Sequence, residues 1–315
     1  MIYTIENEKL RVEILYLGAS ILSMQYFDGI KWIETTLQYE DLKDYENNNT
    51  YYLNSVIGPH SGRIKNGRYY DGDELVELEV NDGKNHLHGG ATGFHTLKFD
   101  GVVSDDKTTL TLRAFDDVNK CDITLTYSLN REQLDISYQV KVFKDQVVNM
   151  TQHTYFNLSG EDTIEDHRIS VPAEKVCFLD ESGAPERLVD VSDSFDLRSA
   201  VQVGEKMAMT HPQFEISGNI DHPFLVNDGL IRLESDKSGI GVAIGSDRPY
   251  AVVYTGNYFL QEREFKGLGY SKVHQAVAIE PQYLPNDINL GLGENQLIRK
   301  NEDYNQQISY KFYTI

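Results

Sequence analysis

The sequence predicts an all-β protein, organised as a large antiparallel β-sandwich with few short helices. Hydrophobic and polar side chains alternate in many short runs, which is the period of a half-buried strand. Only short connections separate the clearest runs, whereas parallel neighbours would need crossovers of a dozen residues or more. The 20 tyrosines also suit pleated surfaces. We expect one domain over residues 1–315, because no linker, repeat or low-complexity tract interrupts the chain.

The first unit is predicted to be a hairpin. Residues 10–14 alternate between hydrophobic and charged side chains, and Gly18 permits a turn before the hydrophobic run at 21–24. Asp28-Gly29 then closes the unit, since this dipeptide favours tight turns.

The next segment, 38–54, is polar and rich in Tyr, Asp and Asn. We expect it to be a long surface loop. Beyond it, Asn66-Gly67 and Asp71-Gly72 predict two further tight turns.

Residues 107–140 carry the clearest strand pattern. Their hydrophobic residues are spaced by two in three runs: Leu110 and Leu112, then Ile123, Leu125, Tyr127 and Leu129, then Leu134, Ile136, Tyr138 and Val140. Asn130-Arg131-Glu132 separates the last two runs, so we expect three antiparallel strands. Similar short runs at 241–244 and 251–254 continue the pattern in the second half.

The chain has a formal net charge of -20, with 40% hydrophobic and 25% charged residues. This composition is ordinary for a folded globular protein. The acidic balance argues against nonspecific binding to nucleic acid or an anionic membrane, because both attract basic surfaces. A neutral small molecule is the better expected partner.

The two cysteines, Cys121 and Cys177, are 56 positions apart in a chain large enough to fold without a disulfide. Reduced thiols and a cytoplasmic location are therefore expected. The first eight residues lack a basic segment followed by an apolar run, and no stretch approaches the ~20 apolar residues of a membrane span. We expect no export signal and no membrane helix.

Three segments combine titratable side chains with strand and turn patterns. Residues 148–160 read Val-Asn-Met-Thr-Gln-His-Thr-Tyr-Phe-Asn-Leu-Ser-Gly, with His153 at the centre. Residues 85–94 read Asn-His-Leu-His-Gly-Gly-Ala-Thr-Gly-Phe, and residues 279–289 read Ile-Glu-Pro-Gln-Tyr-Leu-Pro-Asn-Asp-Ile-Asn. A lone histidine is more often packed or solvated than catalytic, so the combination of segments carries the information.

Together these segments resemble the aldose 1-epimerase family, also called galactose mutarotases. Residues 85–94 match the family pattern of Asn, a variable residue, Leu-His-Gly-Gly, two variable residues and Gly-Phe. The resemblance implies a galactose mutarotase-like sandwich. It also implies an isomerase that interconverts the α- and β-anomers of free aldohexoses, such as galactose or glucose, by acid/base ring opening without a cofactor.

The resemblance also implies roles for single residues. Glu280 takes the position of the base, His153 that of the general acid, and His88 that of a second donor to the ring oxygen. Arg63 and Asp221 take substrate-binding positions, the latter in Asn219-Ile220-Asp221-His222-Pro223-Phe224. Tyr254-Thr255-Gly256-Asn257 matches a motif that we interpret as structural support beside the pocket.

The acid and the base must start in opposite charge states, and their proximity is expected to favour a protonated His153 and an ionised Glu280. Activity should then follow a bell-shaped pH profile.

The chain departs from the family pattern at two places. Pro281 replaces a threonine after the base. Residues 58–64 read Gly-Pro-His-Ser-Gly-Arg-Ile where the family usually shows Gly-Arg, a spacer and Asn-Arg-Ile, so Pro59 and Gly62 lose two side chains. This departure bears on substrate preference more than on chemistry.

Glycines 89, 90 and 93 are expected to let the backbone approach a ligand closely.

Other functions remain open from the residues alone. His86 and His88 are two apart, so a strand would project both to one side, as cupin-type sandwiches present histidines to a metal; His153 and Glu280 could complete such a site. A hexose-6-phosphate epimerase would need an Arg/Lys cluster, whereas the motifs offer mainly Arg63. A noncatalytic sugar-binding protein would not need the two histidines and the glutamate. A monomer and a homodimer are both compatible with the sequence.

Overall fold

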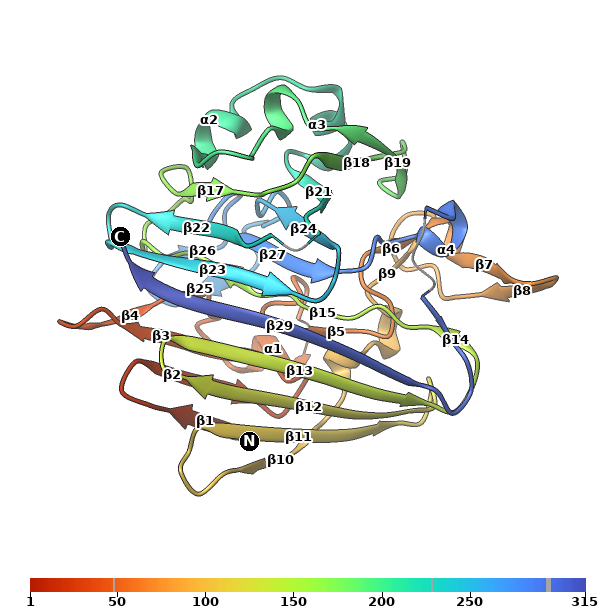
Figure 1. The fold of residues 1–315 in the computed structure, drawn as a ribbon, viewed down its shortest axis with the longest axis horizontal. Helices are drawn as coiled ribbons and strands as arrows, with labels where there is room; N and C mark the ends of the chain where they lie inside the picture. Colours follow the sequence, from red (N-terminus) through yellow and green to blue (C-terminus); the bar gives the residue numbers. More distant parts are fainter. Residues whose placement is uncertain (48, 228, 293–295) are drawn as a thin grey trace.

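Strands dominate the computed structural model, which describes residues 1–47, 49–227, 229–292 and 296–315. The largest sheet has nine strands, in the order β10 (Asp100–Val103), β11 (Thr109–Asp116), β12 (Cys121–Asn130), β13 (Gln133–Val142), β29 (Asp303–Thr314), β23 (Ile240–Ser246), β22 (Ile231–Ser235), β17 (Arg168–Ser170) and β20 (Val201–Gln202). The second sheet has six strands, in the order β16 (Tyr155–Phe156), β27 (Val277–Gln282), β24 (Tyr250–Tyr254), β21 (Asp221–Leu225), β18 (Lys175–Leu179) and β19 (Pro185–Asp190). Figure 1 shows the nine-stranded sheet across the front, with β24 and β27 behind it.

Smaller elements complete the fold. A four-stranded sheet follows the chain as β1 (Ile2–Glu6), β2 (Leu10–Leu15), β3 (Ile21–Phe27) and β4 (Trp32–Glu34). The two-stranded pairs are β5 (Val56–Ile57) with β15 (Thr151–Gln152), β6 (Arg63–Ile64) with β9 (His86–Leu87), β7 (Arg68–Asp71) with β8 (Glu74–Glu77), β14 (Gln146–Val147) with β28 (Leu297–Ile298), and β25 (Glu264–Phe265) with β26 (Gly269–Tyr270). The α-helices are α1 (Lys43–Asn47), α2 (Val203–Met207), α3 (Pro212–Ser217) and α4 (Asp287–Leu290).

The predicted strand patterns are confirmed. β2 and β3 pair antiparallel, and the Asp28 carboxylate accepts hydrogen bonds from the backbone N–H groups of Ile30 and Lys31 in the turn that follows. β11, β12 and β13 form consecutive antiparallel pairs, and the ten hydrophobic residues named for them are all buried. These side chains join residues of β24 and β27 in one hydrophobic core, which explains why their inward faces are uniformly apolar.

The prediction of a surface loop over residues 38–54 is right only in part for the described residues of that segment, several of which are exposed; Asn48 lies outside the described residues. The segment contains α1 and buries three tyrosines, Tyr39, Tyr45 and Tyr51, whose rings pack edge-on or tilted on neighbouring aromatic rings. Each ring buries a large apolar area while its hydroxyl can still find a partner; that of Tyr51 donates to the Leu260 carbonyl at 2.8 Å. The tyrosine-rich composition therefore made a partly buried segment look polar in the sequence.

No helix within the described ranges is long and apolar enough to cross a membrane.

Candidate active site

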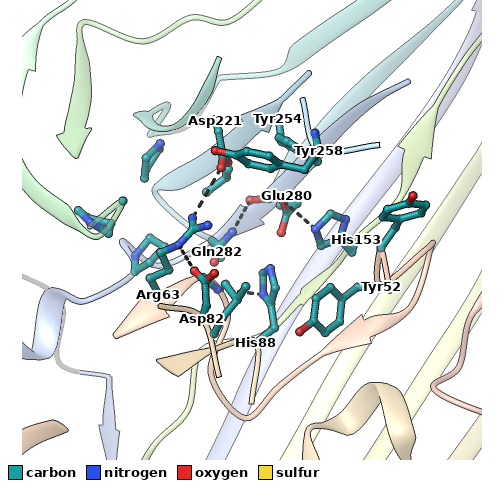
Figure 2. A pocket seen from close by; sticks show the side chains of 18 of the residues that line it. Tyr52, Arg63, Asp82, His88, His153, Asp221, Tyr254, Tyr258, Glu280 and Gln282 are labelled. Atoms are coloured by element: carbon teal, nitrogen blue, oxygen red, sulfur yellow. Dashed lines mark hydrogen bonds and ion pairs between the residues drawn. The ribbon is translucent and has the colours of Figure 1, made fainter. Parts of the chain in front are cut away.

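A cavity of about 260 Å³ opens over one face of the six-stranded sheet (Figure 2). Its lining includes all five residues that the sequence singled out: Arg63, His88, His153, Asp221 and Glu280. Further lining residues are Tyr52, Asp82, Val252, Tyr254, Tyr258, Gln282 and Pro285. This volume is just below the range of roughly 300–1,000 Å³ that is typical of ligand pockets.

The sheet register places the carboxylates on one surface. Glu280 pairs with Val252, and Asp221 pairs with Tyr254, in adjacent antiparallel ladders. Because successive side chains of a strand point to opposite faces, Glu280 and Gln282 project from β27 to the same side.

Asn149 brings the loop segments to this surface. Its carboxamide exchanges two hydrogen bonds with the backbone of Tyr283, at 2.9 and 3.1 Å. Its backbone N–H donates to the Pro59 carbonyl at 2.7 Å, and its carbonyl accepts from the Ser61 N–H at 2.8 Å. One residue of the 148–160 segment thus fastens both the 58–64 and the 279–289 segments beside His153.

Glu280 and His153 face each other in the cavity. The Oε1 atom of Glu280 lies 3.5 Å from the Nε2 atom of His153. Glu280 is 2% exposed and His153 is 4% exposed. The Oε2 atom of Glu280 and the Nδ1 atom of His153 have no hydrogen-bond partner in the described structure. Both groups therefore keep capacity for a ligand.

Burial opposes the charge states expected from proximity. Desolvation raises the pKa of Glu280 well above its usual value, and the negative charge of Asp221 adds to this shift. Desolvation also lowers the pKa of His153 to about 3. Desolvation in the ligand-free cavity therefore favours the neutral forms of both groups and opposes the ion pair that their proximity was expected to favour.

His88 presents a neutral imidazole to the cavity. Its Nδ1 atom accepts a hydrogen bond from the Gly62 backbone N–H at 3.2 Å, so its proton belongs on Nε2. Burial lowers the pKa of His88 well below the ordinary value, and the neighbouring His153 lowers it further. The centroids of these two rings are 5.3 Å apart. His88 can thus donate a hydrogen bond without carrying charge.

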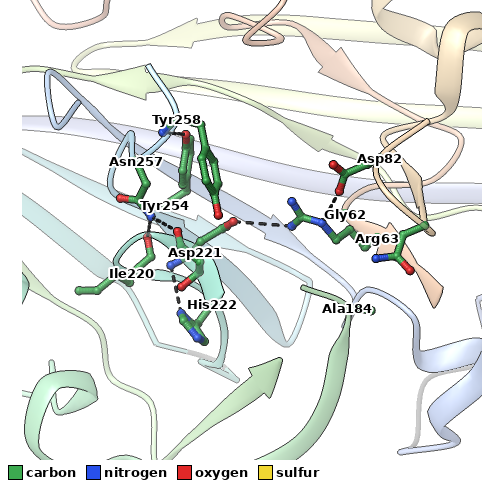
Figure 3. A network of polar contacts seen from close by, with 12 residues as sticks. Gly62, Arg63, Asp82, Ala184, Ile220, Asp221, His222, Tyr254, Asn257 and Tyr258 are labelled. Atoms are coloured by element: carbon green, nitrogen blue, oxygen red, sulfur yellow. Dashed lines mark hydrogen bonds and ion pairs between the residues drawn. The ribbon is translucent and has the colours of Figure 1, made fainter. Parts of the chain in front are cut away.

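Arg63 links two carboxylates at the other end of the cavity (Figure 3). Its Nε atom lies 2.6 Å from Asp82 Oδ2, and its Nη1 atom lies 3.6 Å from Asp221 Oδ2. Burial raises the pKa of Asp221, and the positive charge of Arg63 opposes that shift. The positive charge of Arg63 is thus balanced by the two carboxylates, and all three side chains line the cavity.

Sequence reasoning missed several lining residues, among them Asp82, Gln282 and Tyr52. Asp82 precedes Gly83 and looked like an ordinary turn residue. Gln282 lies two positions after Glu280, and strand alternation could have placed it on the same face. Tyr52, one of 20 tyrosines, is inconspicuous in sequence, yet its ring lies 4.8 Å from that of His88 and 6.3 Å from that of His153.

The expectation that glycines 89, 90 and 93 approach a ligand is wrong, because all three pack against protein atoms. A Cβ atom on Gly89 would lie 2.3 Å from the Gly58 carbonyl oxygen, and one on Gly93 would lie 2.6 Å from the His88 carbonyl oxygen. A Cβ atom on Gly90 would lie 2.3 Å from a carboxylate oxygen of Glu79. These glycines shape the loop that carries His88.

The two histidines of the metal-site alternative point to different partners. The Nε2 atom of His86 lies 3.0 Å from the Nδ1 atom of His60, and its other ring nitrogen lies 2.7 Å from the Glu79 carbonyl oxygen. His88 has a φ of 52°, so the chain leaves the extended conformation there and the alternation assumed for a strand no longer holds. The described residues contain no group of three or more His, Cys, Asp or Glu arranged to hold a metal.

The segment from Tyr254 to Asn257 supports the wall beside Asp221, as predicted. The Thr255 hydroxyl donates to the Ile220 carbonyl at 3.1 Å, and the Asn257 carboxamide also donates to that carbonyl at 3.1 Å. Tyr254 additionally contributes its side chain to the cavity lining. The motif therefore fixes the residue that precedes Asp221.

Comparisons with known proteins agree with this geometry. The family described as aldose 1-epimerase matches residues 1–311. The aldose 1-epimerase of Escherichia coli (strain K12) is 30% identical over 278 residues, covering 83% of this chain and 80% of that protein. The galactose mutarotase of Mus musculus is 28% identical over 326 residues, covering 98% and 93%.

Solved structures give the same result. The crystal structure of an aldose epimerase homologue from C. elegans superposes with a TM-score of 0.89 at 25% identity, covering 100% of this chain and 99% of that one. The galactose 1-epimerase from Lactobacillus acidophilus NCFM gives a TM-score of 0.87 at 26% identity, covering 99% and 93%. The mutarotase-like sandwich predicted from the sequence is thereby confirmed.

Proposed function

This chain belongs to the aldose 1-epimerase family and is an isomerase that interconverts the anomers of an aldose, and we propose that Glu280, His153 and His88 open its ring while Arg63 and Asp221 bind it. The observation that supports these roles most directly is the buried pair of Glu280 and His153, 3.5 Å apart in the cavity. Ring opening needs an acceptor for the C1 hydroxyl proton and a donor to the ring oxygen. Both oxygens are bonded to C1, so two groups this close can serve them together.

In the proposed step, the Glu280 carboxylate takes the proton of the C1 hydroxyl. The bond between C1 and the ring oxygen breaks, and its electron pair moves to the ring oxygen. That oxygen takes the proton of the His153 imidazolium, which leaves an open-chain aldehyde. After rotation about the C1–C2 bond, the transfers run in reverse and close the ring on the other face.

The preference for neutral forms that desolvation imposes on this pair is compatible with the step. Neutral Glu280 with neutral His153 carries the same number of protons as the ion pair, so one proton transfer between them interconverts the two forms. Hydrogen bonds from the sugar hydroxyls to the carboxylate, and from the imidazolium to the ring oxygen, favour the ionised form. Substrate binding thus stabilises the ionised form of the pair, which burial destabilises by desolvation.

His88 supports the same step as a second donor. Its Nε2–H is free for the ring oxygen because Gly62 occupies Nδ1. A preorganised donor aimed at developing charge is most effective in a site that excludes water.

The proposed substrate is a free aldohexose such as galactose or glucose. Arg63 is the one cationic side chain among the described residues lining the cavity, and it is already paired with Asp82 and Asp221. A phosphate group at Arg63 would meet the carboxylates of Asp82 and Asp221, so a phosphorylated hexose is disfavoured by repulsion.

We also propose a cytoplasmic location, which the cysteines support. Cys121 and Cys177 are buried free thiols. Burial raises the pKa of Cys121 to about 12 and that of Cys177 to about 11, so both stay protonated and unreactive. A reducing compartment suits this chemistry.

Polarimetry with fresh α-anomers of galactose, glucose and other aldoses tests the proposal against the spontaneous rate. We expect acceleration with at least one free aldohexose and little with glucose 6-phosphate. Glu280→Gln should reduce turnover by about 10²- to 10⁴-fold, because the amide cannot accept the proton. Near-normal turnover in that variant would remove Glu280 from the role of base.

A further inference from the structure

The carboxamide of Gln282 stands out in the cavity because its oxygen is unpartnered. Gln282 is 0% exposed and lines the cavity beside Glu280. Its Oε1 atom has no hydrogen-bond partner in the described structure, whereas its Nε2 donates to the Glu280 backbone carbonyl at 3.3 Å. A buried acceptor without a donor is costly, so the polar group needs a partner that the protein does not supply.

The surroundings of this oxygen do not offer it a donor from Gly62, its neighbour across the cavity wall. A Cβ atom placed on Gly62 would lie 3.9 Å from Gln282 Oε1, so the oxygen faces the backbone that precedes Arg63. Gly62 offers no side chain, and its N–H is already donated to His88. In Figure 2, Gln282 lies between Glu280 and Arg63. The unused acceptor is thus positioned between the reacting end and the binding end of the cavity.

We propose that Gln282 is a substrate-binding residue whose Oε1 accepts a hydrogen bond from a sugar hydroxyl other than that at C1. The inference rests on the proposed sugar-binding function of the cavity. Residues 280 and 282 on one strand are separated by about 7 Å along its axis, so a sugar with C1 at Glu280 presents a more remote hydroxyl to Gln282. Gln282 therefore selects for an aldose that carries this hydroxyl.

Kinetic measurements that combine each enzyme variant with each deoxy sugar test the proposal. The sugars are the best aldohexose substrate and its 2-, 3-, 4- and 6-deoxy analogues, and the measurement is kcat/KM from polarimetry or NMR exchange. One analogue should lose about three- to tenfold in kcat/KM with the wild-type enzyme, the value of one hydrogen bond. With Gln282→Met, the parent sugar should lose a similar factor and that analogue should lose little more.

Gln275 provides a matched control. It is also 0% exposed and has one amide atom without a partner, Nε2, but it lies outside the cavity lining. Gln275→Met should leave the discrimination among the deoxy sugars unchanged. If Gln282→Met fails to fold in a thermal unfolding assay, Gln282→Asn keeps the carboxamide but withdraws it by one methylene, and it should show the same loss for the parent sugar and the same loss of discrimination.

Two results would overturn the role of Gln282: unchanged kcat/KM for every sugar in Gln282→Met, or an equal loss for all of them. Either result would leave the epimerase assignment intact, provided that the wild-type enzyme accelerates mutarotation. A wild-type enzyme inactive on every free aldose would instead refute the proposed function.

Discussion

The two ends of the cavity treat their polar groups differently, and the Arg63 end is the more exposed of the two. At the Glu280 end, a carboxylate oxygen and an imidazole nitrogen of His153 lack partners. At the Arg63 end, the guanidinium already contacts Asp82 and Asp221. Unpaired groups are costly in the empty protein and available for proton transfer, whereas paired charges form a stable surface for hydroxyl groups. The difference predicts that changes at the first end affect turnover, and changes at the second affect binding.

After Glu280→Gln, the largest effect is expected for His153→Ala. Without the imidazole the ring oxygen has no proton donor at this position, so kcat should fall by about 10²- to 10⁴-fold with a modest change in KM. Polarimetry over a range of sugar concentrations measures both. His95→Ala removes a neighbouring histidine outside the cavity lining and should leave kcat nearly unchanged. Unchanged kcat in His153→Ala would assign the acid to another residue.

Asp221→Asn should act mainly on binding. Losing a charge-assisted hydrogen bond to the sugar is expected to raise KM about tenfold, with kcat within a few-fold of the wild type. Asp82→Asn is the comparison, because Asp82 also pairs with Arg63 but is more exposed, and a smaller rise in KM is expected. A fall in kcat without a change in KM for Asp221→Asn would contradict the division of roles.

Gly62→Ala tests the connection between the two ends. Gly62 has a φ of +67°, and a Cβ atom there would lie 2.6 Å from Pro285 Cβ. The substitution should lower the free energy of unfolding by about 1–3 kcal/mol and weaken sugar binding. Gly72 has a similar φ of +60° with nothing within 4 Å, so Gly72→Ala isolates the backbone strain. If the two variants lower the unfolding temperature equally, the contact of the new methyl group with Pro285 adds no destabilisation.

The smallest expected effect is on the acidic side of the pH profile. An imidazole whose pKa is lowered stays neutral until the pH approaches that lowered value, and burial lowers the pKa of His153 to about 3. The quantity kcat/KM reports the free enzyme, so it should not fall as pH decreases from about 7 to about 5. An acidic limb near the ordinary histidine pKa of about 6.5 would show that His153 is more solvated than the structure indicates.

The sequence determined much of the fold by itself. Period-two hydrophobic runs located β2, β3 and β11–β13, because a sheet with one buried face imposes this alternation on its strands. Family motifs also named five of the residues that line the cavity, since their residue types and spacing are retained. Composition alone did not reveal the buried tyrosines within residues 38–54, because their hydroxyls make a packed aromatic cluster look polar.

Tertiary structure decided the rest. Only the register of β21, β24 and β27 sets Asp221 on the same face as Glu280, and only the fold brings Asp82 to Arg63. The charge states of Glu280 and His153 depend on how much water reaches them, which no local sequence specifies. Alternation along a strand is a local property, whereas pairing, burial and proton affinity arise from residues distant in the chain meeting in space.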